Sequence, residues 1–371
     1  MKILVLGTGA QGTTVAKRLD EEPGVSSIIC ADYNTEAVNE LTGILTKAKG
    51  MKCDAYNVDE IINCAQGVDL IVNALPLEFG KNVLDAALAV KANYQDFSST
   101  TAFDEDVNIG WIRGMKYQFE VYSPKFEEIG RLAIIGTGSA PGVICCATRD
   151  AMKYLDTCDT IYNFVWEGVK ANRFQPFWWS PETAIQDMSE PAYTYENGEL
   201  FVRPPFEDPV KRKYDYMDHE VTFLNHCHDE PVQYALNADK YFKGCKNAYF
   251  KYAGTGMDFA EPLYRAGLFD HEEREIKGRK VVPFDVIVES IPKPPKFEEE
   301  IREIIEEGME ADDGCMVVEA YGKKDGKDIL VENHVFAPGI VEAFERAKMT
   351  GEMYLTGQGG YLFSKMFING D

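Results

Sequence analysis

The chain has 371 residues, 45% of them hydrophobic, and a formal net charge of −23. This length is typical of two domains, and the strong acidity argues against nucleic acids or anionic membrane surfaces as partners. No apolar run is long enough to span a membrane, so we expect no membrane-embedded segment.

The first residues predict a nucleotide-binding fold. An apolar strand at residues 2–6 runs into Gly7-Thr-Gly9-Ala-Gln-Gly12, and residues 13–19 follow as a helix. A strand, G-x-G-x-x-G and a helix in this order are typical of dinucleotide binding. Gly7 would make the turn, Gly9 would let a pyrophosphate reach the backbone at the helix N-terminus, and Gly12 would let the helix pack closely. The residues predicted to bind the cofactor here are Gly7, Gly9, Ala10, Gln11 and Gly12.

An acidic residue follows the second predicted strand, residues 25–31. Asp32 lies twenty residues after Gly12, where this fold needs a group that accepts hydrogen bonds from the adenine ribose hydroxyls. The next residues, Tyr33-Asn34-Thr35, include no cation for a 2′-phosphate, and Asp32 would repel one. We therefore predict NAD in preference to NADP. A glycine-rich loop that binds no dinucleotide is the alternative.

Strands and helices continue to alternate up to residue 154. This alternation predicts a parallel, doubly wound sheet, with ligands beyond the carboxyl ends of the strands. The turn at residues 136–142 either lies beside the nicotinamide or is a plain strand-to-helix connection. Strands are expected at residues 53–56, 69–74, 94–98 and 132–135, and helices at residues 35–45, 58–65, 79–90 and 143–154. The residues that we place nearest the cofactor are Asn73, Pro76, Asp96 and Ser98, and we also expect Leu75 and Gly138 to bind it.

From residue 160 the strand candidates become longer and alternate between apolar and polar positions. They predict a mixed, largely antiparallel sheet with helices on one face, a separate α+β domain. The chain then returns to a helix at residues 338–348 and a glycine turn at residues 357–360, and the acidic segment 297–313 is expected to be a surface helix. The strand candidates are residues 160–168, 193–202, 219–225, 248–253 and 281–290, with a hairpin formed by residues 315–321 and 328–335.

Six stretches together resemble the saccharopine dehydrogenase-like family, which includes lysine 6-dehydrogenases. They are ILVLGTGAQG at the start, residues 69–98, GTGSAPGV at 136–143, SPETAI at 180–185, HDEPVQY at 228–234 and residues 337–353. The resemblance implies a Rossmann domain, an inserted substrate-binding and dimerisation domain, and a final helix packed back on the first domain. We accordingly expect residues 1–145 plus 338–371 in the first domain and 146–337 in the second, in a homodimer or higher homo-oligomer.

The resemblance also implies hydride transfer between NAD(P) and a carbon–nitrogen bond of a small molecule. Members of the family act on amino acids, on conjugates of two amino acids and on polyamine precursors. Our first prediction is an NAD-dependent oxidoreductase for an amino acid or amino-acid conjugate, as in lysine 6-dehydrogenases. A saccharopine-type reductase and a polyamine-forming enzyme are the enzymatic alternatives, and a non-catalytic NAD-binding regulator is the alternative from another class.

Hydride transfer from an amine needs a base, because an alkylammonium cannot give up hydride. Asp96 at a strand end, and His228 and Glu230 in the second domain, are the candidates for such a base or for holding the substrate amine. His226-Cys227-His228 could contribute to a metal site, but no other ligand spacing accompanies it, so we predict no metal.

A substrate carboxylate would need hydrogen-bond donors from the protein. Arg173 lies in an aromatic loop and could bind a carboxylate with both of its forked N–H groups. Ser180 and Thr183 lie at a predicted helix start, a second site that suits an anion.

The first residues and the spacing of the cysteines predict the cellular location of the protein. The first strand begins at residue 2, which leaves no room for a signal peptide, and the nine scattered cysteines form no CxxC pair. We therefore expect reduced thiols in a cytoplasmic protein.

Overall fold

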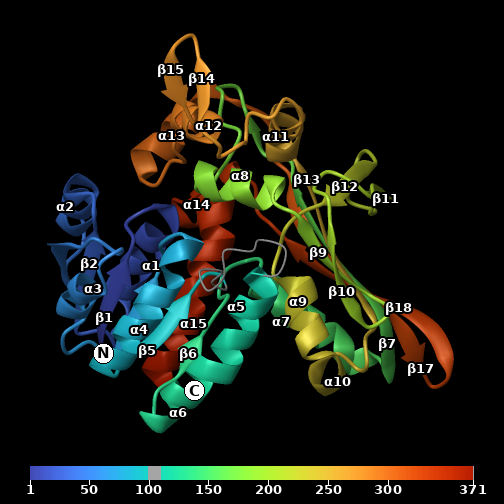
Figure 1. Cartoon of the computed structure of the whole chain (residues 1–371), viewed down its shortest axis with the longest axis horizontal. Helices are drawn as coiled ribbons and strands as arrows, with labels where there is room; N and C mark the ends of the chain where they lie inside the picture. The colour runs from blue at the N-terminus through green and yellow to red at the C-terminus, as the bar shows by residue number, and fades with distance from the viewer. Residues whose placement is uncertain (99–109, 371) are drawn as a thin grey trace. The chain divides into compact units, whose positions relative to one another are not determined.

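The computed structural model describes residues 1–98 and 110–370, which form two compact units (Figure 1). The first unit is Met1–Val143 with Met353–Asp371, and the second is Ile144–Glu352. Among the described residues, no helix is both long and apolar enough to cross a membrane.

A six-stranded parallel sheet in the order β3-β2-β1-β4-β5-β6 forms the centre of the first unit. The side chains of residues 3–6 in β1 are almost fully buried on both faces, which explains why this part of the strand is one continuous apolar run. The doubly wound fold predicted from the sequence is confirmed. The strands are β1 (Lys2–Leu6), β2 (Ser27–Asp32), β3 (Ala48–Lys52), β4 (Leu70–Asn73), β5 (Asn93–Asp96) and β6 (Ala133–Ile134).

Helices cover both faces of this sheet. On one face Ile3 and Val5 pack with Val15 of α1 and Tyr361 of α15. On the other face Leu4 and Leu6 pack with apolar residues of α3 and α4. The helices are α1 (Ala10–Glu21), α2 (Thr35–Gly43), α3 (Val58–Cys64), α4 (Gly80–Val90), α5 (Gly110–Tyr117), α6 (Ser123–Glu128) and α15 (Gln358–Asn369), with shorter turns η1 (Leu77–Phe79), η2 (Gln118–Tyr122) and η4 (Met353–Gly357).

Two local predictions in the first unit are wrong. The strand expected at residues 53–56 is β3 at Ala48–Lys52, an edge strand whose exposed lysines and glycine give no apolar pattern. The turn expected at residues 357–360 lies in η4 and α15. Its glycines serve close packing: a Cβ on Gly357 would lie 2.5 Å from Thr14, and one on Gly360 would lie 2.4 Å from Phe97.

The second unit contains a mixed sheet in the order β10-β9-β13-β7-β17-β18, with β12 and β11 continuing from β13. Strands β7 and β13 are parallel and the other pairs of this sheet are antiparallel. The sheet is therefore mixed and largely antiparallel, as predicted. The strands are β7 (Thr157–Glu167), β9 (Ala192–Glu196), β10 (Glu199–Arg203), β11 (Val210–Arg212), β12 (Val221–Asn225), β13 (Asn247–Gly254), β17 (Gly314–Lys324) and β18 (Lys327–Phe336), with two small ribbons, β8 (Lys170–Ala171) with β16 (Met309–Ala311), and β14 (Arg274–Ile276) with β15 (Arg279–Val281).

Helices α7 and α9 pack on one face of this sheet. The buried Asn163 of β7 donates to Thr148 of α7 at 3.2 Å and accepts from Tyr234 of α9 at 2.9 Å. The helices of this unit are α7 (Val143–Ala151), α8 (Pro181–Ser189), α9 (Glu230–Leu236), α10 (Ala238–Tyr241), α11 (Thr255–Arg265), α12 (Pro283–Ser290), α13 (Glu298–Glu307) and α14 (Ile340–Ala347), with the short turn η3 (Met152–Tyr154).

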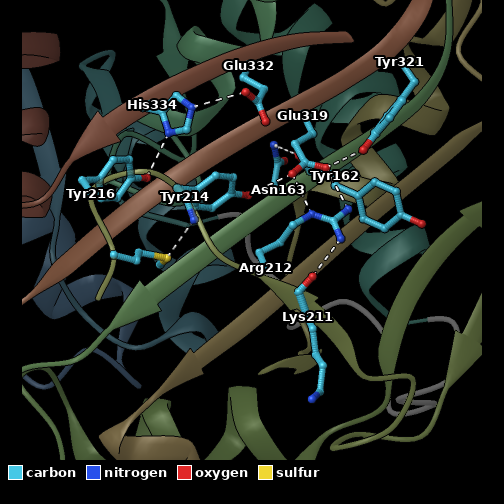
Figure 2. Close-up of polar contacts among 11 residues, drawn as sticks. Tyr162, Asn163, Lys211, Arg212, Tyr214, Tyr216, Glu319, Tyr321, Glu332 and His334 are labelled. Carbon is cyan, nitrogen blue, oxygen red and sulfur yellow. Dashed lines mark hydrogen bonds and ion pairs between the residues drawn. The ribbon is translucent and has the colours of Figure 1, made fainter. Parts of the chain in front are cut away.

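The opposite face carries a polar network (Figure 2). Glu319 of β17 is 2% exposed and accepts two hydrogen bonds from Arg212, at 2.7 and 2.9 Å. Tyr214 and Tyr321 also donate to this carboxylate, at 3.0 and 2.7 Å. Four hydrogen bonds therefore compensate the burial of one carboxylate.

Three expectations for the later chain need correction. Residues 193–202 are the hairpin β9–β10, because Asn197 and Gly198 take the positive φ angles of a tight turn. Residues 281–290 are mostly helix α12, which Pro283 begins. Helix α14, expected in the first domain, lies in the second unit, where the Asp312 carboxylate accepts from the first N–H groups of this helix. The acidic helix expected at residues 297–313 is confirmed for α13, with Ile301 and Ile304 buried, but it ends at Glu307 and residues 309–311 form β16.

Candidate functional site

The glycine turn after β1 has the geometry that phosphate binding needs. Gly7 has a φ of +96°, which favours glycine, and its N–H donates to Ala31 at 2.8 Å. A Cβ on Gly12 would lie 2.0 Å from the Gly7 carbonyl oxygen, so the turn closes only without one. A Cβ on Gly9 would meet nothing within 4 Å. The open side of the turn is therefore at Gly9, where a pyrophosphate can approach.

The start of α1 is free of a side-chain cap. Gly9 is the N-cap residue and provides no side-chain acceptor for the first N–H groups, while Ala10 and Gln11 form the first turn. Such N–H groups, together with the positive end of the helix dipole, suit an anion. The residues present thus fit the phosphates of a dinucleotide.

Asp32 closes this turn from the end of β2. Its Oδ2 accepts from the N–H and the hydroxyl of Thr8, at 2.7 and 2.9 Å, and its Oδ1 accepts from the Asn34 N–H at 3.0 Å. A carboxylate has about four acceptor positions, so it keeps capacity for a ribose hydroxyl. The parallel register places Lys52 of β3 opposite Asp32, a neighbour that sequence spacing does not reveal.

Asn73 and Asp96 lie in one buried network. The Asn73 amide donates to the Tyr94 hydroxyl at 3.1 Å, and this hydroxyl donates to Asp96 Oδ2 at 2.8 Å. The Gly136 N–H donates to Asp96 Oδ1 at 2.7 Å, and the Leu75 N–H donates to Asn73 Oδ1 at 3.2 Å. Burial and the neighbouring Asp96 raise the pKa of Tyr94. One carboxylate oxygen of Asp96 thus holds the second glycine turn in place, and the other accepts from Tyr94.

The remaining residues predicted near the cofactor lie in two loops. Pro76 precedes η1 and, like Leu75, is half-buried. Gly138 lies in the second glycine turn, where a Cβ on it would lie 3.2 Å from the Phe97 carbonyl oxygen.

A buried glutamine that the sequence did not indicate ties this second turn to the C-terminal helix. Gln95 donates to the Gly360 carbonyl at 2.7 Å and to the Thr137 hydroxyl at 3.0 Å, and it accepts from Ser364 at 2.8 Å. Because it is fully buried and hydrogen-bonded at both ends, Gln95 fixes the position of α15 on the sheet.

Arg173 does not have the surroundings expected of a carboxylate-binding residue. Its guanidinium forms a two-point ion pair with Glu307 of α13, and Glu303 lies 3.8 Å away. The hydrogen bond to Glu307 is the main reason that the pKa of Arg173 is raised. The forked donors are therefore already used within the second unit.

The start of α8 is capped by its own chain. Ser180 is the N-cap residue, and its hydroxyl accepts from the Thr183 N–H at 3.4 Å. This cap uses one of the N–H groups that an anion would need, so the cap serves helix α8 first.

His228 and Glu230 are brought together as a buried ion pair. His228 Nδ1 contacts Glu230 Oε2, and the imidazole stacks on Phe250 with ring centroids 3.9 Å apart. Burial alone would lower the pKa of His228, but the charge and hydrogen bond of Glu230 raise it to about 9. Glu230 is fully buried, and its Oε1 has no hydrogen-bond partner among the described residues.

Further carboxyl groups that the sequence reasoning missed lie nearby: the charge of Asp187 acts on His228, and the charges of Asp187, Glu167 and Glu352 act on Tyr252. Burial raises the pKa of Asp187 well above its ordinary value, although the nearby His228 opposes the shift. Burial and the charge of Glu352 raise the pKa of Glu167, at the end of β7, to about 8. Tyr252 donates to Glu167 at 2.5 Å, and its ring contacts Trp179, with ring centroids 6.3 Å apart. We call Glu167, Asp187, Glu190, His228, Glu230 and Glu352 the acidic cluster.

The only sequence signal for this cluster is weak. Glu167 follows the apolar run Phe164-Val-Trp166 at the carboxyl end of its strand, and Asp187 follows apolar positions of a helix. No described group of three or more His, Cys, Asp or Glu residues has an arrangement that could hold a metal ion.

The first unit defines the class of protein: its strand order, glycine turn and uncapped helix start are those of a dinucleotide-binding domain. Residues 3–120 match the family model described as the saccharopine dehydrogenase NADP binding domain. The chain is 24% identical to carboxyaminopropylagmatine dehydrogenase of Synechocystis sp., over 80% of this chain and 74% of that protein. It is 24% identical to carboxynorspermidine synthase of Vibrio alginolyticus, over 100% of this chain and 89% of that protein.

Two solved structures share the fold. Saccharopine dehydrogenase (L-Glu forming) from Saccharomyces cerevisiae has a TM-score of 0.61 and 13% identity, over 100% of this chain and 91% of that one. Homospermidine synthase from Legionella pneumophila, in complex with NAD, has a TM-score of 0.63 and 12% identity, over 100% and 84%. The resemblance to the saccharopine dehydrogenase-like family is confirmed: the model of that family's NADP binding domain matches the first unit, and the similar proteins that span most of the chain are a dehydrogenase and a synthase.

Proposed function

We propose that this protein is an NAD-dependent oxidoreductase acting on the secondary amine that joins a polyamine chain to a carboxylated fragment. This was an alternative from the sequence, and it now stands ahead of lysine 6-dehydrogenase. The observation that carries the proposal is the acidic cluster of the second unit. Its five carboxyl groups belong to Glu167, Asp187, Glu190, Glu230 and Glu352.

A polycationic substrate suits this cluster, because an ammonium ion beside a buried carboxyl group stabilises the charged form that burial disfavours. Buried carboxyl groups are costly unless each meets a cation or a hydrogen-bond donor, and His228 meets this need for Glu230 at one oxygen. The ammonium groups of a polyamine chain would supply further cations, and Glu230 Oε1 is a buried acceptor without a described partner. The rings of Trp179 and Tyr252 add faces on which an alkylammonium can rest.

An amino acid such as lysine fits this set less well. Lysine carries fewer ammonium groups than a polyamine chain, so it would meet fewer of the buried carboxyl groups. The curated relatives support the same choice, because carboxyaminopropylagmatine and carboxynorspermidine both combine cationic amines with a carboxylate.

Glu167 is our candidate for the base. Bound NAD accepts hydride from the carbon next to the reacting nitrogen, or its reduced form returns one. Before oxidation the substrate nitrogen must lose its proton, and a carboxyl group with a pKa of about 8 can take it near neutral pH. Tyr252 holds the Glu167 carboxyl group through its hydroxyl.

We further propose NAD rather than NADP. The carboxylate of Asp32 would repel a 2′-phosphate, but the matched family is described as NADP-binding and Lys52 lies opposite Asp32 in the sheet. Changing Asp32 to Ala should narrow the preference for NAD, whereas changing Lys52 to Ala should leave NAD affinity unaltered. A wild-type enzyme that turns over faster with NADPH would contradict this choice.

The deciding experiment is a substrate panel with both cofactors. Carboxynorspermidine, carboxyaminopropylagmatine, lysine and saccharopine are each offered with NAD and with NADP, and formation of the reduced cofactor is followed by absorbance. We expect turnover with a carboxylated polyamine. Turnover with only lysine or saccharopine would reject the substrate class, and tight NAD binding without any turnover would favour the regulator.

A pair of variants then tests the acidic cluster. Glu167→Gln keeps the shape but not the charge, and should lower kcat/KM for amine oxidation by about 100-fold or more while NAD affinity stays unchanged. Glu289→Gln, on the exposed surface of α12, is the matched control and should behave as wild type. In the wild type, kcat/KM for oxidation should rise with pH up to about pH 8, the pKa of Glu167, and this rise should vanish in Glu167→Gln.

The cytoplasmic location and the homodimer or higher homo-oligomer remain predictions. Light scattering of the purified chain would measure the oligomeric state.

A further inference from the structure

Two tyrosines of the first unit are more exposed than any other large hydrophobic side chain among the described residues. Tyr33 is 71% exposed and Tyr56 is 73% exposed. Single exposed hydrophobic side chains are common on protein surfaces, so the place of these two in the fold decides what they can do. Both follow strands of the parallel sheet, at the edge where this fold binds its ligands.

Tyr33 directly follows Asp32 at the carboxyl end of β2, so its side chain begins one residue beyond the carboxylate assigned to the adenine ribose. The next residue, Asn34, caps helix α2 with its side chain. The backbone at Tyr33 is therefore held between a strand end and a helix start, while the ring extends into solvent. Leu41 of α2 packs in the same core cluster as α1, so the loop with Tyr33 leads to that face of the sheet.

Tyr56 comes from the loop after β3, the strand beside β2. The Cys53 N–H donates to the Asp32 carbonyl at 3.0 Å, so this loop leaves the sheet next to Asp32. The side chain of Asn82 in α4 donates to the Ala55 carbonyl at 2.9 Å, and Ala55 belongs to the core cluster of α3 and α4. The loop with Tyr56 is therefore held on the face of the sheet that α3 and α4 cover.

A third ring extends the wall that Tyr56 begins. The ring of Tyr56 meets Phe79 edge to face, with centroids 4.7 Å apart and an interplanar angle of 63°. Phe79 ends η1, the turn after β4, and a Cβ on Gly7 would lie 3.2 Å from Leu75 in the same loop. The loops after β3 and β4 thus bound one side of the carboxyl edge of β1 and β2, and the loop with Tyr33 bounds the other side.

The chemistry of adenine matches two aromatic walls at this place. Adenine is bonded to the ribose whose hydroxyls would donate to Asp32, so the base must lie close to the end of β2. The base is flat, and its two faces gain from stacking on aromatic side chains. Replacing one such ring by alanine typically weakens binding by a factor of about 5–150.

We propose that Tyr33 and Tyr56 form an aromatic clamp for the adenine ring of the dinucleotide, with one tyrosine on each side of the base. The proposal rests on the dinucleotide-binding part of the proposed function and adds the residues that hold the base. The start of α1 binds the phosphates and Asp32 binds the ribose, while the two rings supply the apolar contact. ADP-ribose, which is NAD without its nicotinamide, should therefore bind at this site and displace NADH.

Calorimetric titration of the full-length protein with ADP-ribose tests the clamp. Tyr33→Ala and Tyr56→Ala should each raise the Kd for ADP-ribose by about tenfold, because each variant loses one stacked ring. Tyr33→Phe and Tyr56→Phe keep the ring and should bind within about twofold of the wild type. Tyr154→Ala removes a 55% exposed tyrosine of the second unit, so it is the matched control and should leave the Kd unchanged.

Urea unfolding without ligand separates lost stacking from lost stability. Because the ring of Tyr33 is exposed, Tyr33→Ala should unfold at the same urea concentration as the wild type. Tyr56→Ala also loses the contact with Phe79, and Tyr56→Phe keeps that contact as well as the ring.

Three results would overturn the clamp while leaving the cofactor assignment in place, provided that the wild type binds NADH. They are wild-type affinity for ADP-ribose in either alanine variant, phenylalanine variants that bind as weakly as the alanine variants, and ADP-ribose that binds without displacing NADH. A wild-type protein that binds neither NADH nor ADP-ribose would reject the cofactor site and the clamp together.

Discussion

Gly9 offers the sharpest test of the cofactor site, because its position is open while its neighbour Gly12 is closed. A Cβ on Gly9 meets nothing within 4 Å, and the backbone there has a φ of −71° and a ψ of −170°, which any residue adopts. Gly9→Val should therefore fold normally. Its branched side chain would occupy the space in front of the first N–H groups of α1, where the pyrophosphate belongs.

The size of the effect follows from the contacts that are lost. Hydrogen bonds to a charged group contribute about 1.5–3 kcal/mol each, so losing two of them costs about 3 kcal/mol or more. We therefore expect the Kd for NADH to rise by a factor of about 100 or more. Fluorescence titration with NADH measures this, and urea unfolding in the absence of cofactor measures the stability of the same variant.

Two further glycine variants control the experiment. Gly43 ends α2 and is exposed, and a Cβ added there would likewise meet nothing within 4 Å, so Gly43→Val should leave the Kd for NADH unchanged. Gly12→Ala places its Cβ 2.0 Å from a carbonyl oxygen and should lose stability as well as NADH binding. If Gly9→Val binds NADH as tightly as the wild type, the assignment of the phosphate site is wrong.

Three more predictions follow from ion pairs and buried acids. Arg173→Lys should leave KM for the substrate within about twofold, because the guanidinium pairs with Glu307 and an exposed pair contributes only about 0–1 kcal/mol; a tenfold rise in KM would restore the carboxylate-binding role. Asp96→Asn should cost about 1–3 kcal/mol of unfolding free energy in urea, because an amide cannot accept on both sides as the carboxylate does, and an unchanged midpoint would contradict this. Burial would raise the pKa of Glu319, but the hydrogen bonds from Arg212, Tyr321 and Tyr214, together with the charge of Arg212, outweigh it and the pKa is lowered. Glu319 should therefore stabilise the fold fully at any pH above its pKa in the unfolded chain. This stabilisation should disappear as the pH falls through the lower pKa of Glu319 in the folded protein. The difference in unfolding free energy between wild type and Glu319→Gln should accordingly shrink in acid.

The sequence determined most of the first unit, because its signals are local. Strands β1, β2 and β4 are largely continuous apolar runs, and Gly7, Gly9 and Gly12 have roles that depend on nearby residues. Asp32 lies directly after such a strand, so the same local pattern locates it. The sequence also predicted that the second unit contains a mixed sheet. It did not predict the helix that Pro283 begins, because the apolar and polar residues at 281–290 alternate in a way that also suits a strand.

Only the tertiary structure decided the roles of the polar residues. Arg173 meets an acid 134 positions away, and the acidic cluster combines the end of β7 with helices α8 and α9, so no spacing in the sequence announces either. The glycines at 357–360 read as a turn, but they let a helix lie against Thr14 and Phe97. Burial and long-range neighbours change both the charge of a side chain and its use, and neither is a property of the local sequence.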